Sequence, residues 1–576
     1  MSPPESDGGA FDWSALDLAG LNASLRGQPD HEQPCPDWLT SSYWEPREFW
    51  AWLRARHMEQ NERYTKSVLG TRYCFFSDMF NRNMDQNSPA FQWCDYAGEI
   101  RAISYRDLSL AASARAAAWT REGLSRGQVL AIVDTMGREC IISIAAALKI
   151  GAVFSWLTPE AEWLARRRLR ALEADWIACA PQYSAMAEEI DGGRLSMGEV
   201  SVEDSLAQDA FSADYLSGSP VALHFNVSDG GYRTPTPLVS DDAYMAALRD
   251  GVVALGLRRG ATYAALGFDE QRIFPALLFA GWLTGATYVH VSPDALLKYP
   301  QLLSKLNLET LLISEAARDV LTQAEINLEG QVRKIVRDLA TGPDLTAWIR
   351  FASVCQTGNI WMGNQLWNAA RGGTSLFSQY YLGRVHADVW PSAGQPFELL
   401  EPVTTQLAAG RHGLLAPVPL FADAEDEGQV TPILIAGKPT GYVFADLFIE
   451  GRGPYWIPAD DMVTIVGTLH GCLGLLFAMT PGVREDGRAS LDCVVFHTET
   501  AIPQEIERTI RARVEFALGG PYVPDRVVFY QFTPPFENGR IDESWCRSRH
   551  QTGLLNRRKG HPVFDTISTM RSCLNE

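Results

Sequence analysis

The sequence is short of positive charge. Its 576 residues include 50 lysines and arginines against 69 aspartates and glutamates, giving a formal net charge of −19. Nucleic acids and anionic membranes carry the same sign and are repelled by such a surface. We therefore expect neither nucleic acid nor a membrane as a partner of this protein.

Paired cysteines and long apolar runs are also missing. The ten cysteines are scattered, none forms a C-x-x-C pair, and none stands at zinc-ligand spacing from a histidine. Apolar stretches such as IISIAAALKIGAVF stop short of the roughly 20 residues that span a bilayer. The opening MSPPESDGGAFDW lacks the basic and apolar regions of a signal peptide. We expect no metal site and a reduced protein of the cytoplasm.

Apolar residues make up 46% of the sequence and charged residues 21%, which is typical of globular proteins. The chain is too long for one ordinary core, so several domains are expected. Residues 1–40 are rich in Pro, Asp, Gly and Ser and predict a flexible leader. Residues 41–459 are predicted to form a large N-terminal domain, and residues 460–576 a small C-terminal one.

Strand and helix patterns alternate along the large domain. Residues 128–134 form a buried-strand pattern, 137–152 a helix that closes at a glycine, and 153–159 another strand. The same order recurs over residues 262–293. This alternation predicts βαβ units in parallel sheets. Residues 491–532 instead read strand, helix, strand in a small α+β unit, so the overall fold class is α/β.

One glycine-rich stretch lacks an expected lysine. The run ALHFNVSDGGYRTPTPLVS, residues 222–240, has an apolar segment, a polar run and two glycines, as backbone loops that wrap phosphate have. Such loops normally carry a lysine close to the glycines. None follows here, so the stretch is a phosphate loop, a degenerate one, or a different device on the same turn.

The order of several segments resembles the adenylate-forming superfamily of acyl-CoA synthetases, and within it the acetoacetyl-CoA synthetase branch. The resemblance covers most of the chain from about Trp44 onward. Each motif is weak alone, and their shared order carries the resemblance. The matching segments are LLFAGWLTGATYVHVSP (277–293), RGGTSLFSQYYLG (371–383), PSAGQPF (391–397), GYVFADLF (441–448), ADDM (459–462) and YVPDRVVFYQFTPPFENGRID (522–542).

The resemblance implies a large domain of βαβ-built sheets sandwiched by helices, with a small, mobile α+β lid that rotates about a hinge at Asp460. It also implies chemistry that joins a carboxylate to AMP from ATP and then passes the acyl group to a thiol, usually that of CoA. Mg²⁺, a cationic loop and a lid lysine offset the charge in such reactions. Asp446 aligns with the ribose-binding aspartate.

The glycine-rich loop departs from the family pattern S-G-T-T-G-x-P-K. With Gly231 on the pattern's second glycine, Thr234 stands where the lysine belongs and Asp229 where a threonine belongs. A carboxylate at contact with phosphate oxygens costs on the order of 1–4 kcal/mol. Arg233 is a nearby cation that offers a substitute. We predict that the turn persists and that its phosphate chemistry is lost.

Other positions depart from the pattern in the same direction. Ser375 replaces the acidic residue of the family's SGGTD motif, and a hydroxyl is a poorer ligand for Mg²⁺ than a carboxylate. Arg540 replaces the lid lysine and keeps the charge but not the compact donor. Uncharged residues stand at three further cationic positions of the family, namely Pro458, Thr464 and Leu469. Together these losses predict a collapse of adenylation.

Polar residues occupy several of the altered positions, which points to an acid–base-capable cleft. The candidate catalytic residues are His224, Asp229, Asp269, Glu270 and Arg540. The candidate substrate-binding residues are Asn226, Arg233, Arg272, Arg371, Ser375 and Asp446, and Asp460 is the candidate hinge. For each, an ordinary solvated or salt-bridged residue is the alternative.

Three functions follow from these residues. The favoured one is an enzyme of small-molecule, secondary metabolism that acts on an acyl or polyketide-like substrate without ATP, by cyclisation, isomerisation or hydrolysis. The second is an atypical acyl-CoA ligase that uses Arg233 and Arg540, and only this alternative requires ATP, Mg²⁺ and CoA. The third is a non-catalytic scaffold. The expected partner is a small acyl-type molecule, with a homodimer as an open question.

Overall fold

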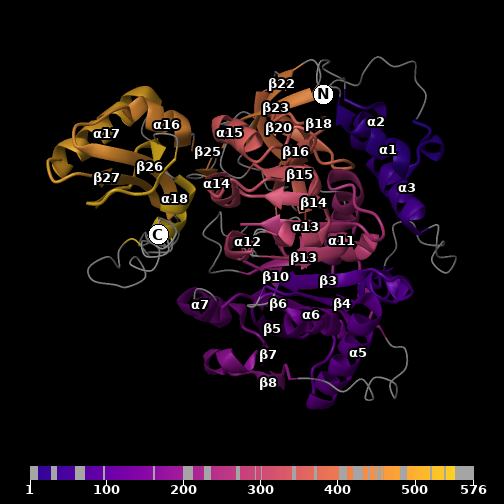
Figure 1. Ribbon diagram of the computed structural model, residues 1–576. Helices are drawn as coiled ribbons and strands as arrows, with labels where there is room; N and C mark the ends of the chain where they lie inside the picture. The colour runs from indigo at the N-terminus through magenta and orange to yellow at the C-terminus, as the bar shows by residue number, and fades with distance from the viewer. Residues whose placement is uncertain are drawn as a thin grey trace.

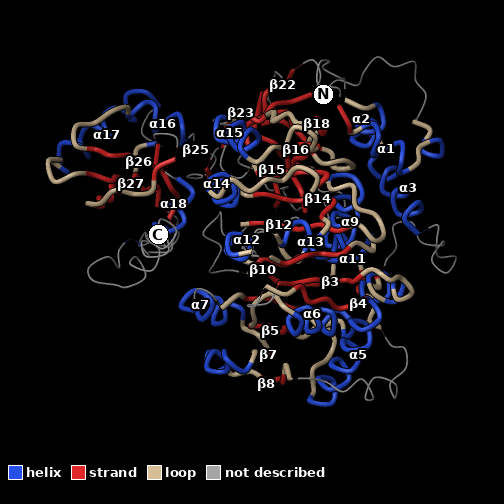
Figure 2. Tube along the Cα trace, viewed as in Figure 1, coloured by secondary structure: helices blue, strands red, loops and turns tan. Residues whose placement is uncertain are grey.

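The computed structural model describes most of the chain. The described residues are 11–27, 35–58, 72–94, 98–159, 162–198, 212–225, 235–267, 273–291, 293–299, 301–339, 345–368, 373–400, 412–418, 433–438, 441–447, 449–450, 456–457, 459–480, 490–518, 522–537, 540–541, 543–551 and 555. Two large sheets with helices between and around them form the main body, and the last elements lie to one side (Figures 1 and 2).

The first sheet has six strands in the described chain. Their order is β11 (Thr236–Val239), β10 (Pro220–His224), β6 (Val153–Leu157), β5 (Val129–Val133), β7 (Trp176–Cys179) and β8 (Gly193–Ser196). All neighbours pair in parallel except β10 and β11, which are antiparallel. The βαβ unit predicted over 128–159 is therefore confirmed.

The second sheet has a parallel centre with antiparallel extensions. Its parallel strands are β3 (Pro89–Cys94), β13 (Thr287–His290), β12 (Thr262–Leu266), β14 (Leu308–Ile313), β15 (Val332–Asp338) and β16 (Trp361–Asn368). On one side β4 (Ile100–Ser104) is added. On the other the sheet continues through β17 (Gly373–Phe377), β19 (Asp388–Pro391), β23 (Gly441–Leu447), β22 (Ile433–Lys438), β21 (His412–Pro417) and β20 (Phe397–Leu400).

Side chains alternate between the two faces of these strands, and both faces are buried. In β5, Leu130 and Ile132 join the core between the sheets, whereas Ala131 and Val133 join an outer cluster under α7 (Glu162–Leu172). Strands covered on both faces read as continuous apolar runs, as this one does. The α/β class with sheets sandwiched by helices is thus confirmed.

The helices between the sheets are well specified locally. In α5 (Tyr105–Glu122) the Ser104 hydroxyl accepts a hydrogen bond from the Asp107 amide at 3.0 Å, and Gly123 ends the helix at φ +117°. The helix α6 (Arg138–Ile150) ends at Gly151, also in the left-handed region. The neighbouring helices α4 (Phe75–Met79), α9 (Ser240–Arg249) and α11 (Ala276–Thr284) complete the layer.

Helices α13 (Leu302–Leu306), α14 (Glu315–Gln323) and α15 (Thr346–Val354) lie near the outer face of the second sheet, beside α12 (Pro293–Lys298) (Figure 1). Their apolar residues pack on Leu311, Ile313 and Ile335 of β14 and β15. None of the helices in the described chain combines the length and the apolar character that crossing a bilayer requires.

The N-terminal segment differs from the expected loose leader. Trp13–Ala15 (η1) and Leu18–Ser24 (α1) are helical, and β1 (Arg26–Gly27) pairs with β18 (Tyr380–Leu382). The Asp17 carboxylate caps α1, and Leu21 is fully buried. Despite the polar composition of the segment, Leu21 and Leu25 pack on α2 (Asp37–Trp44), on α3 (Pro46–Met58) and on the main core.

The last elements form a small α+β group, as expected from their pattern. Its sheet is β26 (Cys472–Thr480), β27 (Ser490–His497) and β28 (Arg526–Tyr530). One face packs on α16 (Ala459–Val466) and α17 (Pro503–Leu518), and the other on α18 (Glu543–Gln551). A domain boundary and hinge at Asp460, near the start of α16, remain predictions.

A buried polar network fastens α18 to this small sheet. Asp492 is fully buried and accepts hydrogen bonds from the Arg526 guanidinium and the Ser490 hydroxyl. The His550 Nε2 atom of α18 lies 2.8 Å from a carboxylate oxygen of Asp492. The network therefore gives the helix a fixed position on the strands.

The packing between α11 and β12 generates a stability prediction. A Cβ atom at Gly281 would overlap the ring and hydroxyl of Tyr263, which donates to the Leu277 carbonyl at 2.8 Å. Alanine in a helix normally adds about 1 kcal/mol of stability over glycine. Here we expect Gly281→Ala to lose about 1–3 kcal/mol through overpacking, measured as a lower thermal midpoint. Gly358→Ala, where a Cβ meets open space, is the control. An unchanged midpoint in Gly281→Ala would contradict the packing.

Candidate functional site

The glycine-rich stretch lies between two antiparallel strands. β10 ends at His224, which pairs with Thr236 of β11, so the chain reverses direction between them. The reversal that the turn requires is therefore present. Residues 226–234 lie outside the described chain, and the loss of phosphate chemistry stays a prediction.

His224 is the one candidate catalytic residue whose side chain is described. It is 4% exposed, and neither ring nitrogen has a hydrogen-bond partner among the described residues. Burial lowers the pKa of His224 to about 4, because removing water disfavours the charged imidazolium. The ring is therefore neutral at neutral pH, with one nitrogen able to donate and the other able to accept.

Ser375 lies on β17, and its match to the acidic metal ligand of the family stays a prediction from the sequence. The residue is 7% exposed, and its hydroxyl has no hydrogen-bond partner among the described residues. It lines a small cavity of about 40 Å³ together with Trp50, Asp242, Arg249 and Gln395. Across the described residues, no group of three or more His, Cys, Asp and Glu side chains is placed to hold a metal ion.

The remaining candidates are not brought together by the described residues. Seven of them lie outside the described chain, namely Asn226, Asp229, Arg233, Asp269, Glu270, Arg272 and Arg371. For three others only the backbone is described: Asp446 lies on β23, Asp460 on α16 and Arg540 on β30 (Arg540–Ile541). Their proposed roles stay predictions from the sequence.

Helix α9 links the two described candidates. It contacts β10 and β11, which carry His224 and its neighbours, and it also contacts β17, which carries Ser375. Asp242 and Arg249 of α9 line the cavity at Ser375. Both candidate side chains therefore take their positions from the same helix.

A buried ion pair fixes the start of β17. The Arg249 Nε atom lies 2.8 Å from the Asp250 carboxylate, and both side chains are almost fully buried. Asp250 accepts the Thr374 amide at 2.6 Å, and Arg249 donates to the Thr374 carbonyl at 3.0 Å. Burial raises the pKa of Asp250, and the Arg249 charge opposes that shift. Sequence reasoning missed this pair, although two adjacent charges after the otherwise Ala-rich α9 signal it.

The N-terminal helices support the neighbouring PSAGQPF turn. The Trp50 indole donates to the Gly394 carbonyl at 2.8 Å, and the Ser42 hydroxyl accepts the Gly394 amide at 2.9 Å. The Tyr43 hydroxyl donates to the Pro391 carbonyl at 2.6 Å. These contacts join residues that lie 344 to 352 positions apart in the chain, so no local sequence signal predicts them.

The fold is that of solved acyl-CoA synthetases and CoA ligases. Acetoacetyl-CoA synthetase from Streptomyces lividans matches with a TM-score of 0.62 and 14% identity, over 89% of this chain and 90% of that one. The resemblance inferred from the ordered motifs is confirmed at the level of the fold.

Two further solved structures share the fold. The anthranilate CoA ligase AuaEII in complex with anthranoyl-AMP matches with a TM-score of 0.58 and 16% identity, over 84% of this chain and 99% of that one. ATP-bound MatB from Rhodopseudomonas palustris matches with a TM-score of 0.55 and 15% identity, over 83% and 99%. No family model and no curated protein matches the sequence.

Removal of the buried carboxylate tests its role. Asp250→Ala leaves the Arg249 guanidinium buried without its counter-ion and the Thr374 amide without its acceptor. We expect a loss of about 3–5 kcal/mol, seen as a large drop in the thermal midpoint. Asp214→Ala removes a partner of an exposed pair with Arg72 at 3.9 Å and should cost at most about 1 kcal/mol. Similar midpoints for the two variants would contradict the assignment.

The buried histidines predict acid sensitivity. Burial lowers the pKa of His57 to about 3 and that of His224, His290 and His386 to about 4. As the pH falls from 6.5 towards 4, the unfolded chain binds protons that the folded chain does not. Each such histidine then lowers the free energy of unfolding by up to about 1.4 kcal/mol per pH unit. Buried carboxyls with a raised pKa, such as Asp134 at about 6, act in the opposite direction.

The variant His224→Gln isolates one of these contributions. We expect the fall in unfolding free energy between pH 6.5 and 4 to become shallower by up to about 1.4 kcal/mol per pH unit. His470→Gln, at an exposed position, is the control and should retain the parent slope. Denaturant titrations at four pH values measure both slopes. An identical slope in His224→Gln would show that the ring is not buried and neutral.

Proposed function

We propose that this protein uses the acyl-CoA synthetase fold to bind an acyl-type or polyketide-like small molecule, and that it acts on it by acid–base catalysis without ATP-dependent ligation. The observation that supports this most directly is His224. A buried, neutral imidazole without a hydrogen-bond partner among the described residues stands at the end of β10, shortly before the two glycines of the glycine-rich stretch.

The neutral ring suits a carbonyl substrate. Because burial lowers the pKa of His224 to about 4, the ring is uncharged at neutral pH. It therefore acts as a neutral hydrogen-bond donor rather than as a cation that pairs with a carboxylate. Its N–H can donate to the carbonyl oxygen of an acyl group and stabilise the charge that develops there when a neighbouring proton is removed. This hydrogen bond also satisfies a buried polar atom that has no partner in the described protein. Cyclisation, isomerisation and hydrolysis of acyl compounds all use such stabilisation.

Ser375 supports the loss of conventional ligation. Adenylation requires Mg²⁺ close to the triphosphate, and Mg²⁺ prefers carboxylate ligands. At the position of the family's acidic residue this chain has a buried hydroxyl instead. The sequence departures at Thr234 and Arg540 point the same way. The acyl-CoA ligase and the non-catalytic scaffold are the outcomes against which the proposal is tested.

The test combines ligand binding with turnover. Acetoacetate, anthranilate and longer β-keto acids are screened by thermal shift, since bound ligand raises the midpoint by linkage. We expect a stabilising compound whose affinity falls about tenfold in His224→Gln, because one hydrogen bond to a buried group is lost. His290→Gln, at a partly exposed histidine on β13 whose pKa burial also lowers to about 4, is the control and should bind like the parent.

Turnover with ATP decides between the proposal and the ligase alternative. Incubation with ATP, Mg²⁺ and each stabilising carboxylate should release no pyrophosphate above the background without protein. Steady pyrophosphate release would establish ligation and overturn the proposal. Absence of both pyrophosphate release and acyl-ligand binding would favour the scaffold, and chromatographic detection of a converted acyl compound would support the enzyme.

A further inference from the structure

A second cavity lies on the N-terminal side of the molecule. Its volume is about 820 Å³, and its walls come from α1, α3, α4, the single turn of π-helix η4 (Asp250–Ala254) and the end of α11. Cavities of about 300–1,000 Å³ are the usual size for small-molecule sites. In Figure 1 the elements α1 and α3 lie on the opposite side of the body from α16, α17 and α18. None of its lining residues lines the cavity at Ser375, and His224 is not among them, so the cavity is separate from the proposed acyl site.

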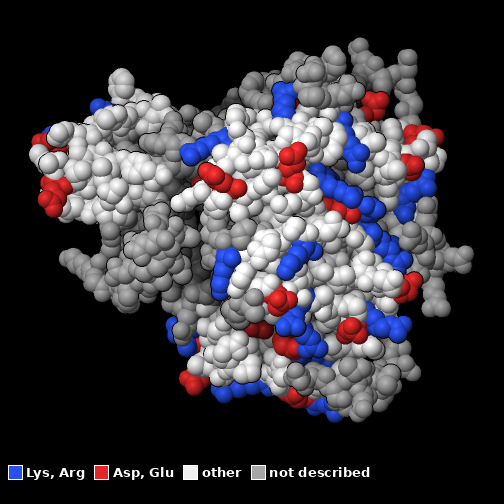
Figure 3. Space-filling model, in the orientation of Figure 1, with Lys and Arg blue, Asp and Glu red and all other residues white. Residues whose placement is uncertain are grey.

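The cavity is strongly basic in an acidic protein. Its described lining contains four arginines, Arg56, Arg82, Arg258 and Arg259, and one carboxylate, Asp85. The whole chain carries a net charge of −19. Figure 3 shows Lys and Arg side chains gathered on the face where α1 and α3 adjoin the large sheet. A concave surface lined by one sign of charge concentrates the field and attracts ligands of the opposite sign.

An adjoining cavity of about 730 Å³ shares Asn22 and Arg258 with the first cavity. Its charges nearly balance, because Arg26 and Arg333 face the carboxylates Glu309 and Glu329, and burial lowers the pKa of Lys334 to about 7. Arg258 pairs with Glu309 at 3.1 Å, so the excess of positive charge belongs to the first cavity.

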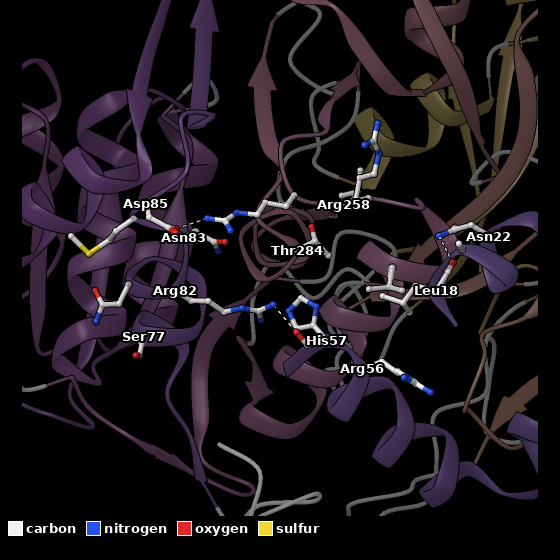
Figure 4. Close-up of a pocket in the computed structure, with 16 residues that line it drawn as sticks. Leu18, Asn22, Arg56, His57, Ser77, Arg82, Asn83, Asp85, Arg258 and Thr284 are labelled. Atoms are coloured by element: carbon white, nitrogen blue, oxygen red, sulfur yellow. Dashed lines mark hydrogen bonds and ion pairs between the residues drawn. The ribbon is translucent and has the colours of Figure 1, made fainter. Parts of the chain in front are cut away.

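The wall of the first cavity contains a buried polar atom without a protein partner. His57 is 7% exposed, and its Nε2 atom has no hydrogen-bond partner among the described residues. The Arg82 guanidinium donates to the His57 carbonyl at 2.6 Å, which holds the two side chains beside each other (Figure 4). Burial lowers the pKa of Arg82, and the nearby Asp78 carboxylate opposes that shift.

The positions of the arginines suit a phosphate group. Figure 4 shows Arg56, His57 and Arg82 on one side of the cavity and Arg258 on another. Planar guanidinium groups donate pairs of parallel hydrogen bonds to phosphate oxygens. Ser77 and Asn81 also line the cavity and offer hydrogen bonds to hydroxyl groups of a ligand.

From this geometry we propose that the basic cavity binds a soluble small molecule that carries a phosphate or diphosphate group, held between Arg56, Arg82 and Arg258. The site lies outside the acyl site, and the protein would therefore bind two chemically different ligands. The volume of about 820 Å³ suits a small molecule, and the net charge of −19 disfavours a nucleic acid or an anionic membrane.

Calorimetric titration of the full-length protein with inorganic pyrophosphate, in a buffer free of Mg²⁺ and phosphate, tests the proposal. We expect saturable binding by the parent protein, and at least tenfold weaker binding by the double variant Arg56→Gln/Arg258→Gln. The control is Arg106→Gln/Arg350→Gln, which removes the same charge from exposed positions on α5 and α15. It should bind like the parent.

The outcomes separate this site from the acyl site. No saturation at millimolar pyrophosphate, or equal affinity in the parent and the double variant, would overturn the proposal. His224→Gln should leave the affinity for pyrophosphate unchanged. The pyrophosphate titration therefore gives the same answer whether or not the acyl proposal is correct. The side chain of Arg258 is 68% exposed, so Arg258→Glu provides a second variant that is expected to fold and to abolish binding.

Discussion

One buried carboxylate sets the position of the strand that carries Ser375. The Asp250 carboxylate pairs with Arg249 at 2.8 Å and accepts a hydrogen bond from the Thr374 amide at 2.6 Å. The Arg249 guanidinium donates a hydrogen bond to the Thr374 carbonyl. Asp250 follows α9 and begins η4, so these contacts fasten one helical segment to β17. An apolar pair of the same size would leave the amide of Thr374 without its acceptor, at a cost of about 1–3 kcal/mol, whereas the Thr374 carbonyl would keep the hydrogen bond from the Ser392 hydroxyl. The site geometry therefore depends on a charge pair that the surrounding core keeps dry.

The same segment borders the two regions to which we assign function. Before η4, α9 contacts β10 with its buried neutral His224 and β17 with Ser375. Within η4, Val252 lines the basic cavity beside Arg82 and His57. The acyl site offers neutral hydrogen-bonding groups, whereas the basic cavity offers guanidinium groups. We propose that the two regions bind ligands of different charge, and the contiguous elements α9 and η4 border them.

Much of the fold could be predicted because its signals are local. The apolar runs of β5 and β6 and the glycines that end α5 and α6 predicted a parallel βαβ unit, which the structure contains. The glycine-rich stretch was correctly predicted to follow a buried strand, because His224 and its neighbours form β10. The helical N-terminal segment was not predicted. Its apolar residues Leu21 and Leu25 are buried only by packing against helices that are distant in the sequence.

The sequence by itself determined the α/β class and the order of the segments that resemble acyl-CoA synthetases, whereas the replacement of charged family residues at Thr234 and Ser375 stays a prediction. These follow from periodicity and residue type, which are properties of short segments. Only the tertiary structure decided that His224 is buried and neutral, that Arg249 and Asp250 hold Thr374, and that Arg56, Arg82 and Arg258 share a cavity. The burial of a side chain, the electrostatic field around it and its distance from other residues depend on contacts between residues far apart in the chain. No local sequence pattern encodes these contacts.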